Sequence, residues 1–184
     1  MPLTKHIRLL IYSYIDVEDT LKTISLISKK ERKALMDSQL AREGKSILMK
    51  IDQLNGYNYD EVLAKKDMLF CLVDFVRIYF SPSTLSANSF YFEQQKLAEL
   101  IVYLPKRFDD KIRLSISLAE EACLVDAFWN HINYHRPKLI FDELSFEKYS
   151  QIDAAAAEFC SKRVKKLCIQ KETRTCPEFE NAIG

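Results

Sequence analysis

The chain has very little glycine. Only 3 of its 184 residues are glycine. Phosphate-binding loops of the P-loop or dinucleotide-binding kind need several glycines at fixed spacing, and no such motif is present. Tight β-hairpins also depend on glycine, so a fold of many antiparallel strands is disfavoured. The sequence therefore argues against nucleotide binding by these routes.

The cysteines lack any recognisable metal or disulfide pattern. Five are present, an odd number, and no Cys-x-x-Cys pair occurs. The last three are spaced eight residues apart, which is not the spacing of zinc ligands. We expect free thiols in a reducing compartment, the cytoplasm or the nucleus, and neither a metal nor another cofactor. The five are Cys71, Cys123, Cys160, Cys168 and Cys176.

Long apolar runs and an excess of one charge are also missing. No run approaches the length of about 20 residues that crosses a membrane. The chain has 27 basic and 26 acidic residues, so no strong field attracts nucleic acid or a membrane surface. The hydrophobic share of 48% suits a globular protein, and the length suits one domain or a small module plus a domain.

Two short amphipathic helices are predicted at the start of the chain. An apolar series at helical spacing comes first, an acidic break follows at Asp16, Glu18 and Asp19, and a second apolar series comes after it. Two such short helices cannot bury their own apolar faces, so they need a partner surface later in the chain or on another protein. This segment is therefore a candidate docking module.

The same segment resembles an F-box, the short helical motif by which substrate adaptors dock on the Skp linker of cullin–RING ubiquitin ligases. The motif's opening Leu-Pro is present in reversed order as Pro2-Leu3, and its Ser-Tyr-Leu step stands as Ser13-Tyr14-Ile15. The family usually has a Trp near the end of the motif, where Glu31 or a neighbour stands here. The resemblance implies that a Skp-type linker contacts Pro2, Leu3, Ile7, Leu10, Ile11, Tyr14, Ile15, Leu21, Ile24 and Ile27.

The middle of the chain has the periodicity of helices. Apolar residues at steps of three and four predict helices over about 34–50, 59–80 and 91–104. The clearest turn is Asn55-Gly56. We place the boundary near it, which gives an F-box-like helical module at 1–50 and a helical and α/β domain at 57–184.

Beyond residue 110 the pattern changes to alternating strands and helices. Strands are predicted within 111–118, 137–146 and 164–170, with helices between them, and this order indicates parallel strands joined by crossovers. The apolar steps from Leu114 to Leu144 and on to Leu167 are 30 and 23 residues, and the region resembles irregular leucine-rich repeats. A plain α/β arrangement is the alternative. The fold class expected is mainly α with a small parallel β component.

Catalytic chemistry has little support in the sequence. His131 and His135 are four residues apart, which places both imidazoles on one helix face, but no third metal ligand is identifiable. Nothing marks one cysteine as activated for nucleophilic catalysis. A small α/β enzyme that uses a histidine or a cysteine is therefore the weaker alternative, and we predict neither a catalytic nor a metal site.

The function expected from the sequence is protein interaction. The resemblance implies a non-catalytic adaptor that docks a Skp-type linker through its N-terminal module, holds a second protein through its C-terminal domain, and serves the ubiquitin-conjugation pathway. A structural subunit of a large assembly that uses the same helical module is the alternative, because the usual Trp is missing.

Overall fold

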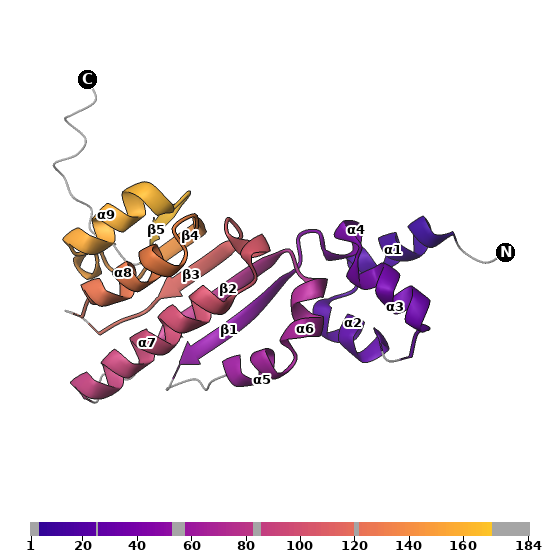
Figure 1. Ribbon diagram of the computed structural model, residues 1–184, viewed down its shortest axis with the longest axis horizontal. Helices are drawn as coiled ribbons and strands as arrows, with labels where there is room; N and C mark the ends of the chain where they lie inside the picture. The colour runs from indigo at the N-terminus through magenta and orange to yellow at the C-terminus, as the bar shows by residue number, and fades with distance from the viewer. Residues whose placement is uncertain (1–3, 25, 53–57, 83–85, 120–121, 171–184) are drawn as a thin grey trace, which may run out of the picture.

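The computed structural model describes residues 4–24, 26–52, 58–82, 86–119 and 122–170 (Figure 1). A five-stranded sheet runs through most of it. All neighbouring strands are parallel, and their order in the sheet is their order along the chain. The strands are β1 (Ser46–Asp52), β2 (Phe75–Ser81), β3 (Ile112–Ile116), β4 (Phe141–Phe146) and β5 (Leu167–Ile169).

One layer of helices covers one face of this sheet. Helices α7 (Ala87–Tyr103), α8 (Asp126–His135) and α9 (Ala154–Arg163) each connect two successive strands, and they lie side by side (Figure 1). Parallel strands that follow one another in order need a crossover of the same hand each time, so every connection returns on the same side. The opposite face of the sheet has no helix laid across it among the described elements.

Shorter helices complete the connections. Between β1 and β2 the chain forms α5 (Tyr59–Ala64), α6 (Lys66–Leu69) and the 3₁₀ turn η1 (Phe70–Leu72). Further 3₁₀ turns are η2 (Lys106–Phe108) and η3 (Tyr149–Gln151).

A four-helix module precedes the sheet. It comprises α1 (Lys5–Tyr14), α2 (Val17–Ile24), α3 (Lys29–Met36) and α4 (Gln39–Arg42). Side-chain oxygens of Thr4, Ser28 and Ser38 accept hydrogen bonds from the first turns of α1, α3 and α4, which explains where these helices begin. The module lies at the end of the molecule opposite α9 (Figure 1).

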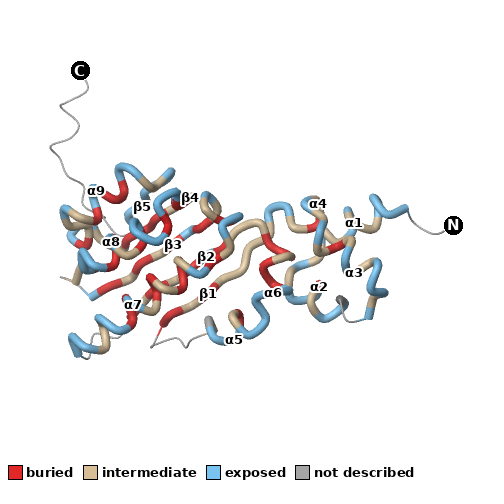
Figure 2. Tube along the Cα trace, in the orientation of Figure 1, coloured by how far each residue is buried: buried red, intermediate tan, exposed pale blue. Residues whose placement is uncertain are grey.

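The main core lies between the sheet and its helices. Strand residues at every second position are buried on that side, such as Val76, Ile78 and Phe80 of β2 (Figure 2). A smaller cluster inside the N-terminal module is built on Leu35 and Ala41, together with Leu72 from η1.

The expected fold class, mainly α with a small parallel β component, is wrong. The sheet has five parallel strands over residues 46–169, and the chain is an α/β protein. The ranges 34–50 and 59–80, both predicted as helix, are helical in their first parts, but they overlap β1 and β2 at their C-terminal ends. The apolar residues of 68–79 continue the helical step of α6 and η1 into β2, which begins at Phe75, and only the pairing of β2 in the sheet selects the alternating pattern there.

The three later strands are confirmed. β3, β4 and β5 fall inside the predicted ranges and pair in parallel. β1 begins at Ser46, so the last residues of the module assigned to 1–50 form part of the sheet. The Asn55-Gly56 turn lies outside the described residues.

Candidate protein-docking surfaces

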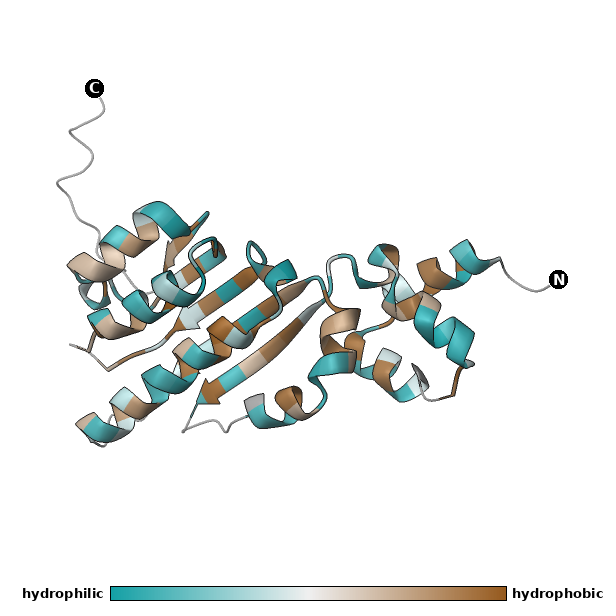
Figure 3. Ribbon diagram, viewed as in Figure 1, coloured by the Kyte–Doolittle hydropathy of each residue, from teal (hydrophilic) through white to brown (hydrophobic). Residues whose placement is uncertain are grey.

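Helix α1 carries an exposed apolar stripe. Ile7, Leu10, Ile11 and Tyr14 are 43%, 39%, 46% and 85% exposed, and their spacing places them on one side of the helix. We call these four residues the outer stripe. Figure 3 shows the apolar stretch of α1 near the N-terminal end of the molecule. Large apolar side chains grouped in this way on a surface are typical of a protein contact.

The opposite side of α1 holds the helix in place. Leu9 and Tyr12 pack against the small cluster of Leu35, Ala41 and Leu72. The helix is therefore apolar on two sides, and only the inner side contributes to the chain's own core. None of the four residues of the outer stripe belongs to either core cluster of the described residues.

Two polar contacts from other elements fix the position of α1. The guanidinium of Arg8 donates to both carboxylate oxygens of Glu31 on α3, at 2.8 and 3.1 Å. The ammonium of Lys45, just before β1, donates to the carbonyl of Tyr12 at 2.6 Å. Burial lowers the pKa of Lys45 from its ordinary value. These contacts tie α1 to α3 and to the start of the sheet.

The structure separates the predicted contact residues into two groups. Ile15, Leu21 and Ile27 are only partly exposed, and Leu21 and Ile27 pack against the chain's own core. Pro2 and Leu3 lie outside the described residues, as does the side chain of Ile24. The surface available to a partner is thus the outer stripe.

One exposed residue was missed by the sequence reasoning. Leu26, between α2 and α3, is 82% exposed. Leu26 and Ile27 are neighbours in one apolar series, and the sequence does not show which of them is exposed. In the structure Ile27 packs inward and Leu26 does not.

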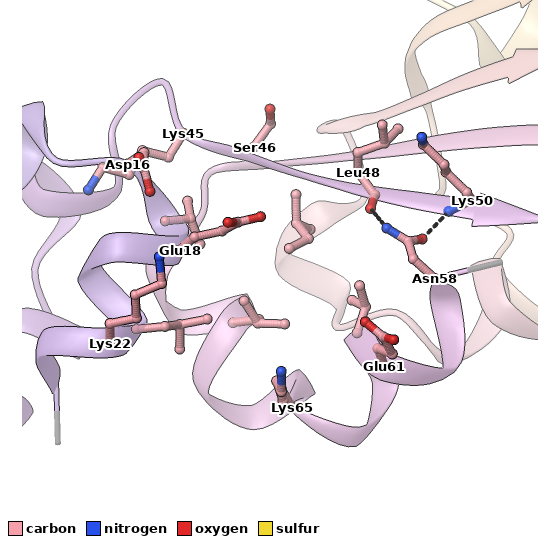
Figure 4. A pocket seen from close by; sticks show the side chains of 15 residues that line it. Asp16, Glu18, Lys22, Lys45, Ser46, Leu48, Lys50, Asn58, Glu61 and Lys65 are labelled. Carbon is pink, nitrogen blue, oxygen red and sulfur yellow. Dashed lines mark hydrogen bonds between the residues drawn. The ribbon is translucent and has the colours of Figure 1, made fainter. Parts of the chain in front are cut away.

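A groove lies between the module and the edge of the sheet (Figure 4). It has a volume of about 870 Å³, and its walls come from α2, β1, α5 and α6. Val17, Leu21 and Leu69 are among its apolar lining residues. Its charged lining residues carry both signs and are Asp16, Glu18, Lys22, Lys45, Lys50, Glu61 and Lys65.

The free edge of β1 is partly covered by one side chain beside this groove. The amide of Asn58 donates to the carbonyl of Leu48 at 2.9 Å and accepts from the N–H of Lys50 at 2.6 Å (Figure 4). A neighbouring strand would satisfy the same two backbone groups. Asn58 thus limits strand pairing at this edge.

The sheet face away from α7, α8 and α9 is polar and carries charges. We call it the open face. Its side chains belong to the strand positions that alternate with the core, including Lys50, Arg77, Tyr79 and Arg113. Such a face is a second candidate for a partner.

The histidine and cysteine side chains do not gather into a metal-ligand cluster in the described part of the chain. The rings of His131 and His135 lie 4.4 Å apart between centroids, and no group of three metal-ligating side chains occurs among the described residues. The four described cysteines are free thiols. Burial raises the pKa of Cys160 to about 11 and raises that of Cys123, which is the opposite of nucleophile activation.

The fold and these surfaces define a class: a parallel α/β sheet covered on one face, preceded by a helical module with an exposed apolar stripe. No family model matches the chain, and no curated protein or solved structure matches it either. None of the described helices has the length and apolar character needed to cross a bilayer.

Proposed function

We propose that this protein is a non-catalytic adaptor of the cytoplasm or nucleus, an F-box-like substrate-recognition subunit of a cullin–RING ubiquitin ligase. The observation that carries the proposal is the outer stripe of α1. The stripe docks in an apolar groove of a Skp-type linker, and the sheet domain holds a second protein.

The geometry of α1 supports this mode of binding. A helix that binds in a groove presents anchor residues at positions i, i+3, i+4 and i+7, and the outer stripe has this spacing. The inner side of α1 and its contacts with Glu31 and Lys45 hold the helix before a partner arrives. A preorganised helix loses less conformational entropy on binding than a disordered segment does.

The position of the module also suits an adaptor. The outer stripe lies at one end of the molecule, and α9 and β5 lie at the other (Figure 1). A linker bound at α1 therefore leaves the sheet domain accessible to a second protein.

A structural subunit of a large assembly is the second candidate. Glu31 stands near the position where the F-box family has its Trp, and it pairs with Arg8 within the module. Glu31 is therefore already engaged within the module. In this case α1 docks on a different subunit of the assembly.

The proposal is tested by co-purification of the full chain with a purified Skp-type linker. We expect Leu10→Asp and Tyr14→Glu to weaken linker binding at least about tenfold, because each buries a charge without a partner in an apolar groove. Tyr103→Glu is the matched control, since Tyr103 on α7 is 80% exposed and Tyr14 is 85% exposed. Equal recovery of the linker by wild type and both α1 variants, or no binding by wild type, contradicts the F-box-like role.

A further inference from the structure

Four side chains of the open face form a small patch on β1 and β2. Leu48 is paired in register with Arg77, and Lys50 is paired with Tyr79. We call these four residues the β1–β2 patch. The two cations lie on one diagonal of the patch, and the leucine and the tyrosine lie on the other.

The charges of the open face are not balanced evenly. Three carboxylates on or beside it pair with cations: Asp142 with Arg113 at 2.7 Å, Glu143 with Lys166 at 2.9 Å, and Asp74 with Lys111. A fourth carboxylate, that of Asp52, lies two residues from Lys50 along β1 and is buried. The side chains of Lys50 and Arg77 make no ion pair or hydrogen bond within the described part of the chain. Among the described residues, the β1–β2 patch therefore carries two positive charges without an acidic partner.

We propose that the β1–β2 patch binds an extended acidic segment of the second protein partner, with carboxylates on residues i and i+2. This inference rests on the proposed function only in taking the sheet domain as the holder of that partner. Lys50 and Arg77 bind the two carboxylates, and Leu48 and Tyr79 contact the apolar atoms between them.

The spacing of the two cations selects this pattern. Adjacent strands lie about 4.8 Å apart and two residues along a strand span about 6.6 Å, so the Cα atoms of Lys50 and Arg77 are separated by about 8 Å. In an extended peptide the side chains of residues i and i+2 point the same way and are about 6.6 Å apart, which long side chains can match. Carboxylates on adjacent residues point to opposite sides, so only one of them reaches the patch.

The groove beside the patch restricts where the acidic segment lies. Leu48 and Lys50 form part of the groove lining, so there is open space next to them. Asp16, Glu18 and Glu61 line the same groove together with Lys22, Lys45 and Lys65, so apart from Lys50 the groove offers a carboxylate no net positive charge. The acidic segment therefore runs across the open face.

The same charges favour a polypeptide over a nucleic acid. A phosphate backbone carries a charge at every nucleotide, whereas Lys111, Arg113 and Lys166, on or beside this face, already pair with carboxylates. A peptide with two spaced carboxylates needs only the two cations of the patch, Lys50 and Arg77.

The test uses the full-length chain and two fluorescein-labelled ten-residue peptides of identical composition. One has Glu at positions 4 and 6, the other has Glu at positions 4 and 5, and the remaining positions are Ser, Thr and Leu. Fluorescence anisotropy at low salt measures both affinities. We expect the first peptide to bind about three- to fivefold more tightly, and this preference to disappear in Lys50→Glu and in Arg77→Glu.

Three comparisons make the result decisive. Lys138→Glu reverses an exposed charge between α8 and β4 and keeps the preference. Leu10→Asp on α1 also keeps it, so a failed linker contact and a failed peptide contact are told apart. Equal affinity for the two peptides, an unchanged preference in Arg77→Glu, or tighter binding of a labelled ten-nucleotide single strand of DNA overturns the proposal.

Discussion

Arg136 shows how one buried cation can complete a helix end. Its side chain is buried and donates to the carbonyls of Ile101, Val102 and Leu104 at 3.2, 2.9 and 2.6 Å. These carbonyls belong to the last turn of α7, where the helix itself supplies no donors. The guanidinium also pairs with Asp109. One side chain from the end of α8 therefore fixes the C-terminal end of α7.

The residue scale also gives a pH prediction. Burial raises the pKa of Cys160 from 9.0 to about 11 in the folded protein. Between these values the unfolded chain loses its thiol proton and the folded chain keeps it, so the free energy of unfolding falls as the pH rises from about 9 to about 11. Urea unfolding of wild type and Cys160→Ala at pH 8 and pH 10.5 measures this effect.

Wild type should lose more stability than Cys160→Ala between those two pH values. The comparison isolates the thiol, because the same lysines and tyrosines titrate in both proteins. An equal loss in both proteins contradicts the assignment.

At the scale of elements, the edges of the sheet are the exposed parts of its backbone. β1 is an edge strand, and two of its outward backbone groups bond to Asn58 instead of to a strand. β5 is the other edge and has only three residues, with Leu167 and Ile169 45% and 37% exposed. A short strand is one of the ways in which proteins limit pairing at an edge.

The prediction for the β1 edge concerns Asn58. Asn58→Ala removes the partners of the Leu48 carbonyl and the Lys50 N–H, and we expect it to lower the free energy of unfolding by about 1–2 kcal/mol. Hydrogen exchange of the Lys50 amide should become faster. Asn133→Ala on the exposed side of α8 is the control. Unchanged exchange at Lys50 would show that this amide is protected by another contact.

For the whole molecule, the question is whether the helical module and the sheet fold as one unit. Val17 and Leu21 of α2 pack against the main core and against the small cluster of the module. The two cores are therefore joined by shared side chains, and no extended linker separates α4 from β1.

We therefore expect one cooperative unfolding transition. Trp129, buried between Phe128 and Phe159, reports on the sheet domain, and hydrogen exchange of the Leu35 amide reports on the module. Both probes should give the same urea midpoint. Leu21→Ala should lower both midpoints together. A module that unfolds at lower urea than Trp129 reports contradicts the single unit.

The sequence predicts a helix or strand correctly where its apolar residues fit only one periodicity. β3, with Ile112, Leu114 and Ile116, is short and alternates cleanly, so it was predicted. β1 comes soon after α4, and β2 comes soon after α6 and η1. The apolar residues of both strands also fit a helix. Neighbouring strands decide such a segment, and a single sequence does not show which strands are neighbours.

The candidate surfaces likewise include one that the sequence predicted and one that it did not. The spacing of Ile7, Leu10, Ile11 and Tyr14 predicted an apolar helix side, and the structure places that side outward. Leu21 and Ile27 have the same apolar character and pack inward. The β1–β2 patch had no sequence signal, because Lys50 and Arg77 are 27 positions apart and meet only through the register of β1 and β2.

The sequence alone determined the amphipathic character of the first helices, the three later strands and the absence of glycine-rich or cysteine-based motifs. These depend on residue type and local spacing. Tertiary structure decided which apolar side of α1 stays exposed, that five strands and not three form the sheet, and which charges on its open face find partners. Each of these depends on packing between segments far apart in the chain, and local periodicity contains no information about that packing.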